Sequence, residues 1–141
     1  MGHANSYHVA TGTFEVGNTQ SRVLQAYLGT CVGVAVADPT AGVGGLIHLL
    51  LPEPVGVAEM DRPATYAVTG VPLFLKHLLD LGADCNHMKA VVAGGALVGP
   101  LSDLDMQLDI GGRTAEKAYT ALHEAGVAVS RAETGGFFTC C

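Results

Sequence analysis

The apolar residues of this chain fall into short runs that are separated by glycine, proline and small polar residues, a pattern typical of strands and turns. Runs rich in valine and in other β-branched or aromatic residues predict strands, because such side chains pack well on a pleated surface. We therefore expect strands over Tyr7–Val16, Arg22–Leu28, Val32–Ala37, Val43–Leu51 and Met88–Ala93, and a last strand that begins at Val127–Val129.

Two segments have the apolar spacing of helices. The first is Thr65–Leu81, and Gly82 after it is the residue type that most often ends a helix. Because Pro72 lacks an amide hydrogen, it predicts either a kink or a helix that starts near this residue. The second helix is expected over Ala115–Ala125, with Thr114 as its N-cap.

Mixed strands and two helices predict one α/β (α+β) domain over residues 1–141. The segment Ala96–Ile110 shows no such periodicity and is expected to be irregular. Of the 141 residues, 49% are apolar and 14% are charged, which is enough apolar material for one core and too little charge for a disordered chain.

Charge and hydropathy restrict the classes of partner. The formal charge is −6, and such a surface does not attract nucleic-acid phosphates or anionic lipid, so we expect neither as a partner. No apolar run approaches the roughly 20 residues that a spanning helix needs, and the N-terminus lacks the features of a signal peptide. We therefore expect a cytoplasmic protein, whose four cysteines are thiols rather than a disulfide framework.

Cys31 and His48 stand on either side of a predicted turn at Asp38–Ala41. With Pro39 at the centre of this turn, Cys31 would lie directly opposite His48, with Cβ atoms about 4.5–5.5 Å apart. If Gly42 joins the loop, the two become diagonal neighbours on one face, about 7–8 Å apart. Only a bulge of one residue would put them on opposite faces.

A thiol beside an imidazole is an arrangement that nucleophilic catalysis uses. A free thiol with a pKa of about 8.5 is mostly protonated at neutral pH, and a nearby imidazole can take its proton. Gly29 and Thr30 allow a sharp turn before Cys31, whose amide could then face a developing oxyanion, so both are candidate substrate-binding residues. The alternative is that Cys31 is a small buried hydrophobe and that His48 is a hydrogen-bonded core residue.

A metal site has weaker support. Cys85 and His87 have a spacing that can bind a metal, but one C-x-H pair without a second cluster is poor evidence for a site. We therefore expect no metal.

The segments LGTCVGVAVADP and VGGLIHLLLP resemble the chemoreceptor glutamine deamidase family, CheD. Further matches include AGGA at Ala93–Ala96 and the glycine pair after Thr134. The resemblance implies a layered α/β/β fold and a cysteine hydrolase without a cofactor. Cys31 would be the nucleophile and His48 the general base for converting a receptor glutamine to glutamate. It also implies chemoreceptors and a CheC-like phosphatase as partners.

Two departures from the family pattern affect this interpretation. The family's third catalytic group is a threonine six residues before the cysteine, and Gln25 stands at that position here. Gln25 could accept a hydrogen bond from the imidazole and orient it, or it could mark a changed substrate or an inactive module that binds a phosphatase or a receptor. The family also has a β-hairpin after the last glycine pair, whereas this chain ends at Cys141. We therefore expect either a domain cut from a longer protein or an incomplete last sheet.

Overall fold

The computed structural model describes residues 5–19, 22–28, 31–54, 62–95 and 110–134. Within these ranges the strands are β1 (Asn5–His8), β2 (Thr13–Asn18), β3 (Arg22–Gln25), β4 (Val32–Asp38), β5 (Val43–Leu49), β6 (Lys89–Gly94) and β7 (Ala128–Thr134). The α-helices are α1 (Ala67–Asp80) and α3 (Ile110–Glu124), and two 3₁₀ helices span Pro63–Thr65 and Cys85–His87.

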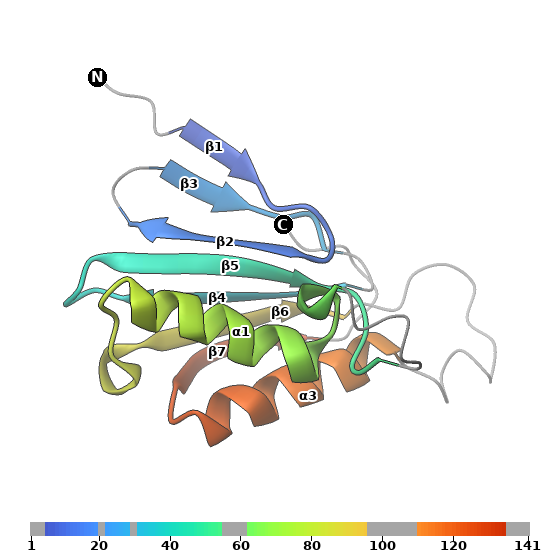
Figure 1. Ribbon diagram of the computed structural model, residues 1–141. Coiled ribbons are helices and arrows are strands. Elements are labelled where there is room, and N and C mark those ends of the chain that lie inside the picture. The colour runs from blue at the N-terminus through green and yellow to red at the C-terminus, as the bar shows by residue number, and fades with distance from the viewer. Residues whose placement is uncertain (1–4, 20–21, 29–30, 55–61, 96–109, 135–141) are drawn as a thin grey trace.

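The strands form two sheets. The larger sheet has the order β2-β5-β4-β6-β7, in which only the β6–β7 pair is parallel, and β1 pairs with β3 in a parallel two-stranded sheet. Figure 1 shows α1 and α3 on one side of the larger sheet and the β1–β3 pair on the other. The predicted α/β class with helix, sheet and sheet layers is confirmed.

The larger sheet packs against a different apolar interior on each side. The helix-side core takes alternate residues of β4 and β5 together with apolar residues of both helices, among them Val34, Ile47, Phe74, Leu78 and Leu122. On the other side lies a smaller group, here called the inter-sheet cluster, which consists of Val9, Ala26 and Leu28 with Leu24, Cys31, Leu46 and Ala93 packed against it. This alternation is what the pleat of a strand produces.

The two predicted strands on either side of the Asp38 turn are confirmed as β4 and β5. The prediction of a single strand over Tyr7–Val16 is wrong. The chain turns at Thr11 and Gly12, and β1 and β2 belong to different sheets. Gly12 has a φ of 77°, a conformation that breaks a strand and that glycine adopts without steric cost. The next predicted strand is also shorter than expected, because β3 ends at Gln25.

The first helix begins at Ala67 and continues through Pro72, so a start near Pro72 is wrong. The amides of Ala67 and Val68 donate to the carbonyls of Leu51 and Pro52, at 3.0 and 3.1 Å. These bonds satisfy amides that have no partner within a helix, and they hold the helix start against the segment that follows β5.

The second helix begins at Ile110, four residues before the predicted cap, so Thr114 is not an N-cap. Thr114 is fully buried inside the helix and Ala115 belongs to the helix-side core, which outweighs the low helix propensity of Gly111 and Gly112. The predicted ends are confirmed, since Gly82 and Gly126 follow α1 and α3 with φ values of 101° and 79°. The predicted irregular segment lies outside the described residues apart from Ile110, which opens α3.

Among the residues that the structure describes, no helix is both long and apolar enough to cross a membrane.

Candidate active site

The turn between β4 and β5 sets the position of the site. One carboxylate oxygen of Asp38 accepts the amides of Thr40 and Ala41 at 2.9 and 3.0 Å, and the other accepts the amide of Asp84 at 2.8 Å. These bonds, the one from Asp84 first, hold the pKa of Asp38 below its ordinary value. Gly42 has a φ of 71°, and its amide donates to the Asp38 carbonyl. Gly42 therefore belongs to the loop.

This loop length decides between the two predicted registers. Asp38 pairs with Val43, and Gly33 therefore pairs with His48. Cys31 lies two residues before Gly33 and packs with the inter-sheet cluster, so it shares a face of the sheet with His48. The directly opposed register is wrong, and the diagonal one is confirmed.

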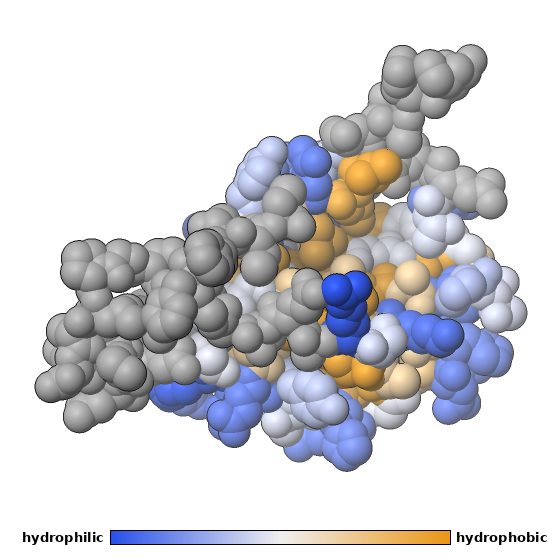
Figure 2. All heavy atoms as spheres, turned by 180° about the vertical axis from the view of Figure 1, so that it is seen from behind, coloured by the Kyte–Doolittle hydropathy of each residue, from blue (hydrophilic) through white to orange (hydrophobic). Residues whose placement is uncertain are grey.

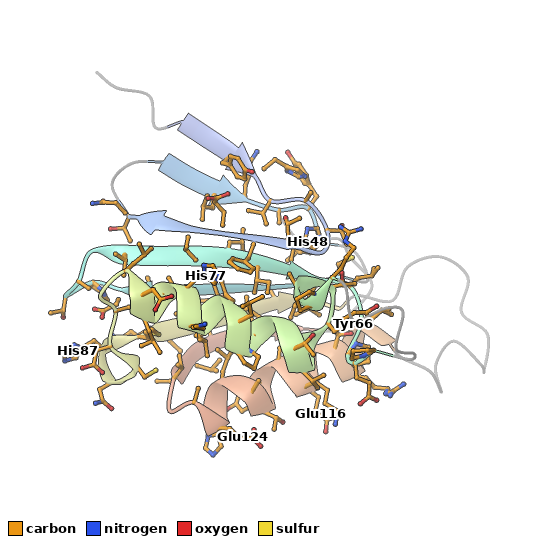
Figure 3. The ribbon with its side chains drawn as sticks, in the orientation of Figure 1. His48, Tyr66, His77, His87, Glu116 and Glu124 are labelled. Carbon is orange, nitrogen blue, oxygen red and sulfur yellow. The ribbon has the colours of Figure 1, made fainter. Side chains whose placement is uncertain are left out.

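His48 has a hydrogen-bond partner at each ring nitrogen. Its side chain is buried at the end of β5, beside the segment that joins β1 to β2 (Figure 3). Nδ1 lies 2.9 Å from the carbonyl oxygen of Val9, and Nε2 lies 3.4 Å from the hydroxyl oxygen of Thr11. Because a carbonyl oxygen can only accept, Nδ1 carries the proton, and Nε2 of the neutral ring presents a lone pair. His48 is thus oriented as a proton acceptor toward Thr11.

Cys31 is a free, half-buried thiol at the start of β4. Burial raises the pKa of the Cys31 thiol above its ordinary value, and a hydrogen bond with the Thr11 side chain acts in the opposite direction. The net effect is upward, so the resting thiol is protonated at neutral pH. A nucleophilic role for Cys31 therefore requires a base.

The backbone of Cys31 is held by the end of β6. The amide of Gly95 donates to the Cys31 carbonyl at 2.8 Å. Gly94 has a φ of 100°, and a methyl group on it would overlap that same carbonyl oxygen. The glycine pair Gly94–Gly95 at the end of β6 therefore allows close approach to the backbone of the candidate nucleophile.

The other predicted site residues have different placements. Gln25 ends β3, and its carbonyl oxygen accepts the amide of Val9 at 2.8 Å. Nδ1 of His48 bonds to Val9 and Nε2 bonds to Thr11, so within the described part of the chain neither ring nitrogen bonds to Gln25. The orienting role of Gln25 stays a prediction. Gly29 and Thr30 lie outside the described residues.

An apolar hollow of about 320 Å³ is lined by residues of both sheets. Its walls include Gly33, which faces His48 across the sheet, and Gln25, with the remainder formed by Leu24, Ala26, Leu28, Ala35, Leu46, Val91 and Ala93. Seen from behind, apolar side chains gather in the middle of the molecule between hydrophilic ones (Figure 2). The hollow therefore reaches the strand position opposite His48, although neither Cys31 nor His48 lines it.

Thr11 and the carbonyl of Val9 are the site features that sequence reasoning missed. Both come from the short segment between β1 and β2, which the apolar pattern joined into one strand. The signal was the Thr-Gly-Thr sequence at Thr11–Thr13, where a glycine between two small polar residues is typical of a turn.

Among the described residues, no group of three or more His, Cys, Asp or Glu side chains could hold a metal ion. Cys85 and His87 share one short 3₁₀ helix, at the far end of the larger sheet from His48.

The protein-family model described as CheD chemotactic sensory transduction matches residues 50–140. The chain is 36% identical over 115 residues to a Clostridium kluyveri protein named as a probable chemoreceptor glutamine deamidase CheD, a match covering 82% of this chain and 71% of that protein. Proteins of the same name from Clostridium tetani and Desulforamulus reducens are 31% and 33% identical. These matches cover 92% and 91% of this chain, and 79% and 77% of the relatives.

Among solved structures, the crystal structure of a Neisseria meningitidis protein of family DUF152 is similar in fold. The TM-score is 0.53 at 10% sequence identity, and the match covers 94% of this chain and 64% of the other. At this identity the likeness concerns the fold alone, and it agrees with the mixed α/β architecture.

Proposed function

Because this chain belongs to the CheD family of chemotactic sensory transduction proteins, we propose that it is a cysteine-dependent deamidase of chemoreceptor glutamines. The relatives' names supply the reaction and the substrate class. The observation that carries the proposal for this chain is that Cys31 and His48 lie on one face of the sheet, with the lone pair of His48 Nε2 turned toward Thr11, the partner of Cys31.

In the proposed reaction, Cys31 loses its proton to His48 and attacks the carboxamide carbon of the glutamine side chain. The C–N bond then breaks, the nitrogen takes the proton from His48, and ammonia leaves a thioester on Cys31. Water, deprotonated by His48, attacks the thioester carbon, the C–S bond breaks, and glutamate and the thiol are released. Each proton that His48 accepts is returned within the cycle.

Two features favour these roles. The lone pair of His48 Nε2 is turned toward Thr11, whose side chain is the hydrogen-bond partner of Cys31, so His48 can serve as the base that a protonated thiol needs. The bond to the Val9 carbonyl would also stabilise the imidazolium that forms when His48 accepts a proton, because the carbonyl oxygen faces the Nδ1 proton.

We further propose that Gln25 is an orienting group and that Gly29 and Thr30 bind the substrate. We also propose that the protein is cytoplasmic and that a CheC-like phosphatase is one of its partners. The sequence pattern and the family resemblance support these proposals. The alternative function is a CheD-like module that binds a receptor or a phosphatase without catalysis, and the experiment below separates the two.

The test is ammonia release from a chemoreceptor fragment, with mass spectrometry of the converted glutamine. We expect Cys31→Ala to abolish release and His48→Ala to lower its rate about 10²–10⁴-fold, the usual range for loss of a general base. Cys85→Ala is the matched control, since Cys85 is also a half-buried free thiol but packs against the helix-side core. Equal release by wild type and Cys31→Ala would refute the proposal, and binding without release would support the module.

A further inference from the structure

Thr11 connects the two residues of the proposed dyad. Its hydroxyl oxygen lies 3.4 Å from Nε2 of His48, and a hydrogen bond from its side chain lowers the pKa of the Cys31 thiol. Thr11 reaches both from the segment between β1 and β2, so it belongs to neither of the two strands that carry the pair. The hydroxyl therefore bridges the candidate nucleophile and the candidate base.

The register explains why a bridge is useful. Gly33, not Cys31, is the residue opposite His48, and diagonal neighbours on one face of a sheet are about 7–8 Å apart at the backbone. At this separation the short Cys31 side chain is less able to contact the His48 ring directly than a directly opposed residue would be. A hydroxyl placed between the two side chains supplies the missing link.

The hydrogen bonds at Thr11 also have a determined direction. The Val9 carbonyl fixes the proton of neutral His48 on Nδ1, so Nε2 can only accept. The hydroxyl of Thr11 must then donate to Nε2, and the lone pairs of its oxygen remain available to the S–H of the neutral thiol. Once the thiol is deprotonated, the hydroxyl can donate to the thiolate, and this is the hydrogen bond that lowers the pKa of Cys31. The result is a directed chain from thiol to hydroxyl to imidazole.

We propose that Thr11 is a third catalytic group, which carries the proton from Cys31 to His48 through its hydroxyl. This inference rests on the proposed function. As the S–H bond breaks, that proton bonds to Oγ1 of Thr11, and the original hydroxyl proton moves to Nε2. Thr11 ends unchanged, the thiolate accepts a hydrogen bond from it, and the imidazolium keeps its Nδ1 proton on Val9.

The local backbone fixes Thr11 for this role. The amide of Gly12 donates to the carbonyl of His48 at 2.8 Å, which ties the turn directly to β5. The amide and the hydroxyl of Thr13 both donate to the carbonyl of Ala10, at 3.1 and 2.6 Å. Thr11 is solvent-exposed although the backbone around it is held by these bonds.

The test compares Thr11→Val, which keeps the shape and removes the hydroxyl, with Thr11→Ser, which keeps the hydroxyl. Thr120→Val is the matched control, because Thr120 is an exposed threonine of α3, an element that carries none of the proposed site residues. The readouts are the rate of ammonia release and the pH dependence of Cys31 alkylation. For Thr11→Val we expect about a 10²-fold slower release, at the low end for loss of a proton-transfer group, and an alkylation midpoint at higher pH.

Thr11→Ser is expected to restore the rate of ammonia release and the alkylation midpoint, and Thr120→Val is expected to match the wild type. Wild-type values for Thr11→Val, or equal defects in Thr11→Val and Thr11→Ser, would overturn the inference. The proposed function is tested separately by Cys31→Ala. If that variant is inactive while Thr11→Val is fully active, the relay fails and the deamidase stands. If Cys31→Ala retains full release, the deamidase itself fails.

Discussion

The carbonyl oxygen of Val9 lies 2.9 Å from Nδ1 of His48, across 39 residues of sequence. A backbone carbonyl cannot be altered by a side-chain change and cannot donate, so it fixes which nitrogen of the ring carries the proton. In the proposed reaction this contact sets the direction of proton transfer, and it can be examined without any substrate.

The first prediction concerns that tautomer. Long-range ¹H–¹⁵N NMR spectra of the neutral state are expected to show His48 protonated at Nδ1 and unprotonated at Nε2, because the Val9 carbonyl accepts only from Nδ1. The exposed ring of His77 on α1 serves as the internal control. Observation of the Nε2-protonated form at His48 would contradict the assigned orientation.

The second prediction concerns the ionisation of Cys31. Since partial burial raises the pKa of its thiol, the rate of alkylation by iodoacetamide should reach half its maximum at a higher pH in the folded protein than in urea. The same shift makes the free energy of unfolding depend on pH. The stabilisation that Cys31 contributes is complete below the pKa of the unfolded thiol, and it is lost as the pH rises through the pKa of the folded thiol. The measurement uses a chain with Cys85, Cys140 and Cys141 changed to serine. A lower midpoint in the folded protein would show that the thiol is already activated at rest.

The third prediction separates backbone strain from disruption of the site. Gly94 and Gly82 have nearly the same φ, 100° and 101°, but a methyl group on Gly82 meets nothing within 4 Å, whereas one on Gly94 overlaps the carbonyl oxygen of Cys31. Gly82→Ala should cost about 1–2 kcal/mol in the free energy of unfolding and leave deamidation intact. Gly94→Ala should cost more and should also slow ammonia release.

Urea denaturation and the deamidation assay together test this pair. If Gly94→Ala retained full activity at a stability like that of Gly82→Ala, the close approach of Gly94 to Cys31 would have no role in positioning the nucleophile.

The fourth prediction concerns acid stability. The backbone amides of Asp84, Ala41 and Thr40 hold the pKa of Asp38 low, so its carboxylate stabilises the fold above the unfolded pKa, and this contribution is lost as the pH falls through the folded pKa. Asp38→Asn should therefore lower the urea midpoint at pH 7 more than at pH 3. Asp80→Asn, at an exposed position at the end of α1, is the control. If Asp38→Asn lowered the urea midpoint equally at both pH values, the charge of Asp38 would make no contribution to stability.

The sequence predicted those parts of the site that depend on neighbouring residues. The buried runs of β4 and β5, the Asp-Pro turn and the shared face of Cys31 and His48 follow from apolar pattern and turn chemistry over about twenty residues. The exact register did not follow, because it depends on whether Gly42 takes a positive φ, which sequence alone does not fix. Thr11 was not predicted because its contact with His48 joins segments 37 residues apart.

The start of α3 shows the same limit in the fold. Gly111, Gly112 and Thr114 locally favour a break followed by a cap, yet the helix runs through all three and buries Thr114. Tertiary packing outweighs local preference there, and it involves residues distant in sequence.

The central strands of the larger sheet serve two interiors with alternate residues. Along β5, Ile47 and Leu49 face the helix-side core, while Leu46 and His48 face the inter-sheet side. In β4, Val34 likewise faces the helix-side core and Gly33, opposite His48, faces the inter-sheet side. Saturation mutagenesis of these strands should therefore show effects that alternate from one residue to the next. One set of positions would govern how much protein accumulates in the cell, and the set between them would govern how fast each molecule turns over. The protein could thus change its catalytic specificity one residue at a time without disturbing the residues that keep it folded.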